Sequence, residues 1–236
     1  MEHLDDVLTK KYPMYVMPIA NFLDLERIQP HEELMEAGKL VKWEDDASEG
    51  AVLFVSHTWL SYTTPDPDGV KLKLVKTILR QMLAGQRIAA HFLAEFYYKM
   101  KLSLESRDVK RCTHVWMDYF SIPQAHREHQ QLAIQSIFAY VASAAFFVVA
   151  AGSWKHREDG STRDVRAWAG RGWCRLEQFA NAMSPASKPL IIAQTPTDVV
   201  GHGPGGATHV CTWIHNTIGR GAFTVDADKE VPGPAC

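Results

Sequence analysis

The strongest constraint on the fold of this chain is a series of short apolar runs separated by longer segments with helical periodicity. The runs cover residues 51–55, 114–117, 146–150 and 190–193, and a weaker one covers residues 222–225. Each run is continuously apolar rather than alternating, which is typical of strands buried on both faces of a parallel sheet. The alternation of such strands with helices predicts a doubly wound α/β fold.

The segments between these runs carry apolar residues three and four positions apart, as an amphipathic helix requires. The first such segment spans residues 70–104 and is expected to break into two helices at Gly85. Residues 132–141 and 176–183 carry the same spacing, and Pro185 limits the second of these helices. We therefore expect helices on both faces of the sheet.

The length of 236 residues suits one α/β domain with an extension. Residues 1–48 are expected to form an N-terminal helical extension, residues 49–228 the α/β domain and residues 229–236 a C-terminal tail. Within the domain, the glycine-rich residues 201–206 are expected to be a flexible loop. They resemble a phosphate-binding loop only in glycine content, because the lysine of that motif is missing.

Composition and charge limit the kinds of binding partner and the cellular location that we expect for this chain. The formal net charge of −2 implies no basic face, so a nucleic-acid partner is not expected. Residues 137–151 are almost wholly apolar but shorter than the about 20 residues of a membrane-spanning helix, so no membrane span is expected. The charged N-terminus lacks the core of a signal peptide, and the four cysteines lack the spacing of a zinc site. A cytoplasmic location with free thiols is therefore expected.

Polar and aromatic residues gather directly after the first two predicted strands. Ser56, His57 and Trp59 follow the first strand, and Asp118 and Tyr119 follow the second. In an open α/β sheet, ligands bind outside the carboxyl ends of the strands, at the point where the strand order reverses. Rings can stack on a base and hydroxyl groups can bind ribose or phosphate, so this arrangement predicts a nucleotide-binding cleft.

Several of these residues also have a purely structural interpretation. His57 could bond a backbone carbonyl, and Asp118 could cap the turn that follows it. Cys174, at an expected helix start, is either a reactive thiol or, as is more common, a buried structural cysteine. His126 and His129 are three positions apart and could share a helix face, but surface histidines are favoured and no metal site is predicted.

A Trp-to-Glu motif follows the third predicted strand and a charged segment. Its residues are Arg171, Gly172, Trp173, Cys174, Arg175, Leu176 and Glu177. Glu177 could pair with Arg171 or Arg175, be a solvated helix residue, or supply a carboxylate to the cleft.

Together these motifs resemble the Toll/interleukin-1-receptor-like (TIR-like) family. In that family the motifs follow a fixed order: a strand ending in Ser, a strand ending in Asp, a third apolar strand, and a Trp-Cys motif that opens a helix. The matching segments here are residues 54–57, 115–118, 146–149 and 173–177. The spacing of four from the Trp to the Glu also matches.

The resemblance is strongest to TIR-like proteins of algae and other protists, which share segments like residues 31–34, 38–40, 54–59 and 172–177. It covers about residues 30–226. It implies a flavodoxin-like, doubly wound parallel sheet of about five strands in the order 2-1-3-4-5, with helices on both faces. Glu177 would then begin the helix after the third strand and face the crevice at the reversal of strand order.

Some members of this family cleave NAD between nicotinamide and ribose. The resemblance therefore implies an NAD glycohydrolase or cyclase in which NAD is the substrate, no cofactor is needed and Glu177 is the key carboxylate. Trp59 or Tyr119 is expected to stack on the nicotinamide. Ser56, His57, Asp118 and Trp173 complete the predicted substrate-binding set.

Two other functions stay open at this point. The chain could be a non-catalytic signalling module that acts through homotypic contacts between TIR-like surfaces, which also imply a homo-oligomer. It could also be a transferase that acts on nucleosides or nucleotides. Two departures from the family bear on the site: residues 119–124 lack the usual glycine, and a charged insert at residues 155–170 could be a lid or an obstruction.

Overall fold

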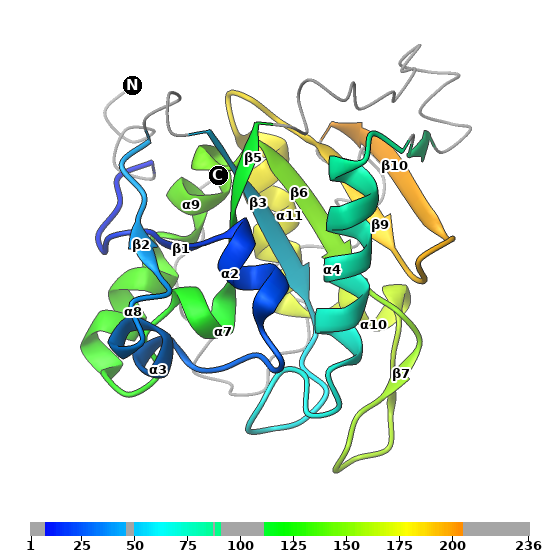
Figure 1. The fold of residues 1–236 in the computed structure, drawn as a ribbon, viewed down its shortest axis with the longest axis horizontal. Helices are drawn as coiled ribbons and strands as arrows, with labels where there is room; N and C mark the ends of the chain where they lie inside the picture. The colour runs from blue at the N-terminus through cyan, green and yellow to red at the C-terminus, as the bar shows by residue number, and fades with distance from the viewer. Residues whose placement is uncertain (1–7, 46–49, 87, 91–110, 205–236) are drawn as a thin grey trace.

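The computed structural model describes residues 8–45, 50–86, 88–90 and 111–204 of the chain. Their central feature is an eight-stranded sheet with the strand order β2-β1-β5-β3-β6-β9-β10-β4 (Figure 1). These strands are β1 (Tyr15–Pro18), β2 (Val41–Lys42), β3 (Ala51–His57), β4 (Ala89–Ala90), β5 (Cys112–Met117), β6 (Phe146–Ala150), β9 (Pro189–Ala193) and β10 (Val199–Pro204). The four central strands β5, β3, β6 and β9 are parallel to one another.

Helices cover both faces of this sheet. Figure 1 shows α2 (Ile19–Asp24) and α4 (Val70–Leu83) on the near face, and α9 (Ile137–Ser143) and α11 (Gly172–Met183) behind the strands. The remaining described helices are α3 (His31–Glu36), α7 (Asp118–Ser121), α8 (Arg127–Gln135) and α10 (Val165–Gly170). A separate two-stranded hairpin is formed by β7 (Trp154–Lys155) and β8 (Thr162–Arg163).

Consecutive residues of the central strands pack against opposite faces, which explains their continuous apolar sequence. Leu53 and Val55 of β3 belong to the core that contains Val75 of α4. Val52 and Phe54 of the same strand belong to the second core, which includes residues of α9 and α11. Because side chains alternate along a strand, a sheet with two covered faces requires an apolar residue at every position.

The predicted α/β class is confirmed, and so are the four predicted strands at residues 51–55, 114–117, 146–150 and 190–193. They occur as β3, β5, β6 and β9 in the spatial order β5-β3-β6-β9, which is the order expected for strands two, one, three and four. The expected fifth strand, at residues 222–225, lies outside the described residues. The place beside β9 is taken by β10, which runs antiparallel to it.

The prediction of a loop at residues 201–206 was wrong for residues 201–204, which belong to β10. Val199 and Val200 pair with Ala193 and Ile192 of β9, and the ladder continues through the glycine-rich residues. Pairing in a sheet uses backbone N–H and C=O groups, so residues without large side chains can extend a strand that its neighbour templates.

The segment expected as a helical extension contains helices α2 and α3, but it also contributes two strands to the main sheet. β1 runs antiparallel to β5, with Met17 opposite Val115, and β2 pairs with β1. The N-terminal segment therefore covers the β5 edge of the parallel sheet. The proposed boundaries at residues 49 and 228 stay predictions.

Two helix boundaries show how local and long-range signals combine. α4 ends before Gly85, as predicted, and Gly85 has a φ of 76°, a conformation that favours glycine. Residues 91–104, where the second helix was expected, lie outside the described residues. The helix expected over residues 132–141 is instead divided into α8 and α9 at Ser136. The Ser136 hydroxyl donates to the Leu132 carbonyl and accepts from the backbone N–H groups of Lys11 and Tyr12.

Among the described residues, no helix is both long and apolar enough to cross a membrane. The apolar residues 137–151 are divided between helix α9 and strand β6, as the sequence predicted.

Candidate functional site

The candidate site lies at the carboxyl ends of the parallel strands, where three distant segments of the chain meet. β3 ends in Ser56 and His57, α7 begins with Asp118 directly after β5, and α11 carries Glu177. β3 has β5 on one side and β6 on the other, so the chain order reverses beside β3. This is the place where doubly wound sheets bind ligands.

Glu177 is the buried carboxyl of this site and is only 7% exposed. Its Oε2 atom accepts a hydrogen bond of 2.5 Å from the Ser56 hydroxyl, whose oxygen in turn accepts one of 2.8 Å from the Trp168 indole N–H. Burial raises the pKa of Glu177 to about 8; the Ser56 hydrogen bond opposes this rise and the Asp118 charge adds to it. At neutral pH, Glu177 is therefore mainly protonated.

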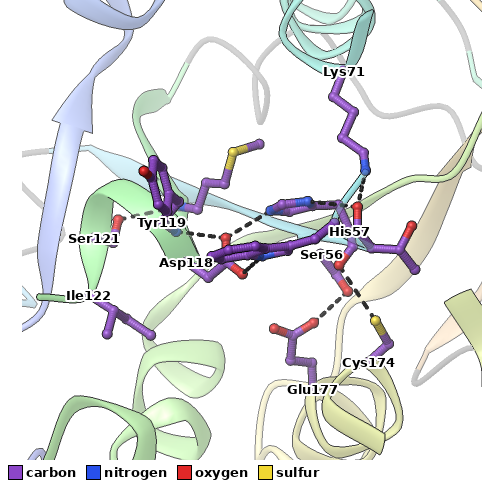
Figure 2. Close-up of polar contacts among 12 residues, drawn as sticks. Ser56, His57, Lys71, Asp118, Tyr119, Ser121, Ile122, Cys174 and Glu177 are labelled. Atoms are coloured by element: carbon purple, nitrogen blue, oxygen red, sulfur yellow. Dashed lines mark hydrogen bonds and ion pairs between the residues drawn. The ribbon is translucent and has the colours of Figure 1, made fainter. Parts of the chain in front are cut away.

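Asp118 is the ionised carboxylate of the same site. Its Oδ1 atom is 2.8 Å from His57 Nε2 and accepts a 2.6 Å bond from the Tyr119 backbone N–H, while its Oδ2 atom accepts a 2.8 Å bond from the Trp59 indole. Burial acts to raise the pKa of Asp118, but the His57 charge and these hydrogen bonds outweigh it and leave the pKa below its usual value. Figure 2 shows Asp118 and Glu177 approaching the end of β3 from different elements.

The two carboxyl groups thus hold opposite protonation states at neutral pH. Their environments push their pKa values apart, because Asp118 contacts His57 and accepts from two N–H groups, whereas among the described residues Glu177 has one hydroxyl partner and lies deeper. Pairs of this kind are typical of sites that perform acid–base or glycoside chemistry.

A cavity of about 410 Å³ opens beside these groups, within the range of small-molecule sites. Glu177, Asp118, Trp59 and Trp173 all contribute to its lining. Its further lining residues are Ser61, Tyr62, Ile122, Gln124, Gln130, Ile134, Ile137, His156, Arg163 and Arg171. The cavity therefore combines two indoles, two carboxyl groups and two guanidinium groups, which suits a ligand with a ring, hydroxyl groups and an anionic part.

The charged insert at residues 155–170 forms one wall of this cavity, through His156 and Arg163. Its hairpin is tied to the loop after β3: Arg157 donates its backbone N–H to the Leu60 carbonyl, and Ser61 donates its hydroxyl to Glu158. Figure 1 shows the hairpin that contains β7 extending beyond the ends of the central strands.

A larger cavity, of about 1020 Å³, lies at the opposite end of the sheet. It is lined by residues near the starts of β3, β6 and β9, including Ala51, Phe146 and Pro189. Size favours this cavity, but the paired carboxyl groups and the topology favour the smaller one. We assign the site to the smaller cavity, because chemistry and strand order decide function more directly than volume does.

Lys71 is a further buried ionisable group near the site. It reaches from α4 to the end of β3, where its ammonium group donates to the Thr58 carbonyl (Figure 2). Burial lowers the pKa of Lys71 to about 7; the carboxylates of Asp66 and Asp118 act in the opposite direction. Lys71 was not expected from the sequence, since it lies among the helical residues of α4 with no local motif.

The loop after α7, which supplies Ile122 and Gln124 to the cavity, is held by helix α3. Glu32 Oε1 accepts hydrogen bonds of 2.8 Å from the backbone N–H groups of both Gln124 and Ala125. The buried His31 ring contacts the Phe120 carbonyl through Nδ1 at 3.0 Å. Helix α3 thus fixes one wall of the site.

The predicted site residues take distinct positions in the structure. Glu177, Asp118, Trp59 and Trp173 line the cavity, whereas Ser56 lies behind Glu177 as its hydrogen-bond donor. His57 holds Asp118, and Tyr119 packs edge-on against Trp59 with the ring centroids 5.4 Å apart. Ser56, His57 and Tyr119 therefore act on the cavity through Glu177, Asp118 and Trp59.

Three residues with alternative interpretations, Cys174, His126 and His129, can also be placed. Cys174 is buried, its thiol donates to the His57 carbonyl, and burial raises its pKa well above the usual value. A structural cysteine fits these properties, because reactivity requires an accessible thiolate. The rings of His126 and His129 contact each other at 5.6 Å, and within the described residues no set of three potential metal ligands is assembled.

The sequence did not point to Trp168, Arg163 or Glu32 as members of the site. A signal was present for Arg163 and Trp168, because both lie in the insert at residues 155–170 that we expected to approach Glu177. Comparisons with protein-family profiles, curated proteins and solved structures return no match for this chain.

Proposed function

We propose that this chain is a TIR-like NAD glycohydrolase that binds NAD in the cavity at the strand ends and cleaves the nicotinamide–ribose bond. The observation that carries the proposal is a buried carboxyl group, Glu177, on the wall of a cavity that also presents two indoles and the Asp118 carboxylate. The proposal includes a cytoplasmic location and a homo-oligomer formed through TIR-like surfaces.

Substrate charge couples binding to the protonation state of Glu177. The nicotinamide ring of NAD is cationic, and a nearby cation favours the ionised form of a carboxyl group. The pKa of Glu177, which burial raises to about 8, should therefore fall when NAD binds. A carboxylate is thus generated beside the ribose at the time when it is needed.

Bond cleavage then requires stabilisation of positive charge on the ribose. The carbon–nitrogen bond breaks with its electron pair moving to the ring nitrogen, so nicotinamide leaves as a neutral molecule. The ribosyl group develops oxocarbenium character, which the Glu177 carboxylate stabilises. Water adds its oxygen to that carbon and releases a proton, which yields ADP-ribose.

The neighbouring groups have supporting roles in this proposal. Trp59 and Trp173 line the cavity and offer ring faces or edges to the nicotinamide. Asp118, whose pKa lies below its usual value, is the ionised group available to accept a proton from the attacking water or from a ribose hydroxyl.

The direct test is nicotinamide release from NAD by the purified full chain at high protein concentration. The wild type should release nicotinamide, and E177Q should reduce the rate about 100-fold or more, since the charge that stabilises the transition state is lost. E36Q is the matched control, because Glu36 is an exposed glutamate on α3. Undiminished release by E177Q, or none by the wild type, contradicts the proposal.

A non-catalytic TIR-like assembly module is the second candidate. The observation that favours it is the near-complete burial of Glu177 with a hydrogen bond from Ser56, which suffices for a purely structural acid. This function predicts ordered oligomers in sedimentation experiments together with no nicotinamide release. Oligomers that form equally well in wild type and E177Q would separate assembly from any chemistry of Glu177.

A further inference from the structure

Arg163 of β8 lines the cavity, and its Nε donor is buried without a hydrogen-bond partner among the described residues. Its Nη2 atom forms a 2.8 Å ion pair with Asp159 Oδ2. Its Nε atom is buried and makes no hydrogen bond within the described part of the chain. Because a buried unpaired donor is costly, a small shift of the side chain that lets a ligand oxygen in the cavity complete this N–H is favourable.

The hairpin that carries Arg163 is held in place from several sides. Trp154 lies opposite Arg163 in the β7–β8 pair, and its ring packs 5.4 Å from the Lys71 ammonium group. The following residue, Asp164, caps helix α10 by accepting a 2.9 Å bond from the Ala167 N–H. Arg163 is therefore positioned before a ligand arrives, which reduces the entropy that binding would lose.

The cavity also holds a second guanidinium group. Arg171 lines the same cavity and is the N-cap residue of α11, a helix of twelve residues. The amino end of a helix of this length carries partial positive charge, which adds to the charge of the side chain. Two guanidinium groups and a helix amino end together favour an oxyanion, and phosphate oxygens match the planar fork of arginine.

We propose that Arg163, supported by Arg171, is the anion subsite of this cavity and binds the phosphate oxygens of a nucleotide. The inference rests on the proposed function in one respect, because the nucleotide is identified through the chemistry expected at Glu177. It adds that the charged insert is a recognition element rather than an obstruction. The Arg163 Nε–H donates to a phosphate oxygen, while Asp159 keeps the guanidinium group oriented.

Equilibrium binding of ADP-ribose, measured by titration calorimetry, tests this subsite without any turnover. R163Q should bind ADP-ribose about 10-fold or more weakly than the wild type, as expected for loss of a charge-assisted hydrogen bond. Adenosine has a base and a ribose but no phosphate, so its affinity should be the same for both proteins. Raising the salt concentration should weaken ADP-ribose binding to the wild type more than to R163Q.

R157Q is the matched control for charge and location. Arg157 lies on the same hairpin and also pairs with an aspartate, Asp68, at 2.8 Å, but it does not belong to the cavity lining. R157Q should bind ADP-ribose like the wild type. R163K keeps the charge but loses the fork geometry, so its affinity should fall between those of the wild type and R163Q. If thermal unfolding shows that R163Q does not fold, R163K replaces it as the variant that tests the subsite.

Nicotinamide release by the same variants separates this inference from the proposed function. ADP-ribose binding that depends on Arg163, without any cleavage of NAD, supports the subsite and rejects the glycohydrolase. NAD cleavage together with equal ADP-ribose affinity in wild type and R163Q supports the glycohydrolase and rejects the subsite. No measurable binding of ADP-ribose to the wild type overturns the subsite.

Discussion

Ser56 at the end of β3 and Glu177 on α11 are 121 positions apart in the sequence, and a hydrogen bond of 2.5 Å joins their side chains. Trp168 donates to the same serine oxygen, so the Ser56 hydroxyl accepts one hydrogen bond and donates the other to the carboxyl group. This arrangement fixes the side chain of Glu177 against the cavity wall. It also makes Glu177 the group whose titration should dominate the pH behaviour of the site.

Stability should depend on pH through Glu177. The pKa in the folded state, raised to about 8 by burial, lies above the ordinary value of 4.5, so the folded chain holds this proton more tightly than the unfolded chain. The stabilisation is fully present below about pH 4.5 and is lost as the pH rises through about 8. Between about pH 5 and about pH 9, the wild type should lose on the order of 3 kcal/mol relative to E177Q. Denaturant unfolding at several pH values measures this difference, and parallel pH curves for the two proteins would contradict it.

Asp118 should influence the titration of Glu177, because its charge is one of the causes that raise the pKa of Glu177. D118N should therefore lower that pKa, which can be followed by carbon-13 NMR of the Glu177 carboxyl group. The substitution also weakens the contacts with His57 and Trp59, at a cost of about 1–3 kcal/mol. D68N is the control, since Asp68 is an exposed partner of Arg157. An unchanged Glu177 titration in D118N would show that the two carboxyl groups are independent.

Glu32 should control the loop that supplies Gln124 to the cavity. E32A removes the acceptor for two backbone N–H groups, so hydrogen–deuterium exchange at Gln124 and Ala125 should accelerate and stability should fall by about 1–3 kcal/mol. Affinity for ADP-ribose should fall with it, and E32Q should restore part of both effects because its amide oxygen still accepts. E33A is the control, as Glu33 pairs with Arg27 on the surface. Equal exchange in E32A and wild type would rule out this role.

Gly152 should be intolerant of a side chain. A Cβ atom there would lie 2.5 Å from the Trp154 ring and 2.8 Å from the Gln194 carbonyl oxygen, both closer than van der Waals contact allows. G152A should destabilise the chain by about 1–3 kcal/mol and displace the hairpin that carries Arg163. Gly170 has no atom within 4 Å of the corresponding position, so G170A should have little effect. Thermal unfolding compares the two variants, and equal melting temperatures would contradict the expected clash.

The sequence by itself determined the central part of the fold. Continuous apolar runs predicted β3, β5, β6 and β9, because a strand covered on both faces must be apolar at every position. Spacings of three and four predicted α4 and α11 through the same burial requirement. The residues after the strands could be singled out in advance, because doubly wound topology brings those strand ends to one edge of the sheet.

Only the tertiary structure decided which groups complete the site and the edges of the sheet. The placement of β1 beside β5 depends on backbone pairing between distant segments, and no local pattern encodes it. Ser136 divides a periodic helix because the N-terminal segment donates to its hydroxyl. Trp168, Lys71 and Arg163 join the site through contacts across the fold. Local periodicity reports burial, whereas hydrogen-bond partners and shifted pKa values depend on neighbours that only the folded chain assembles.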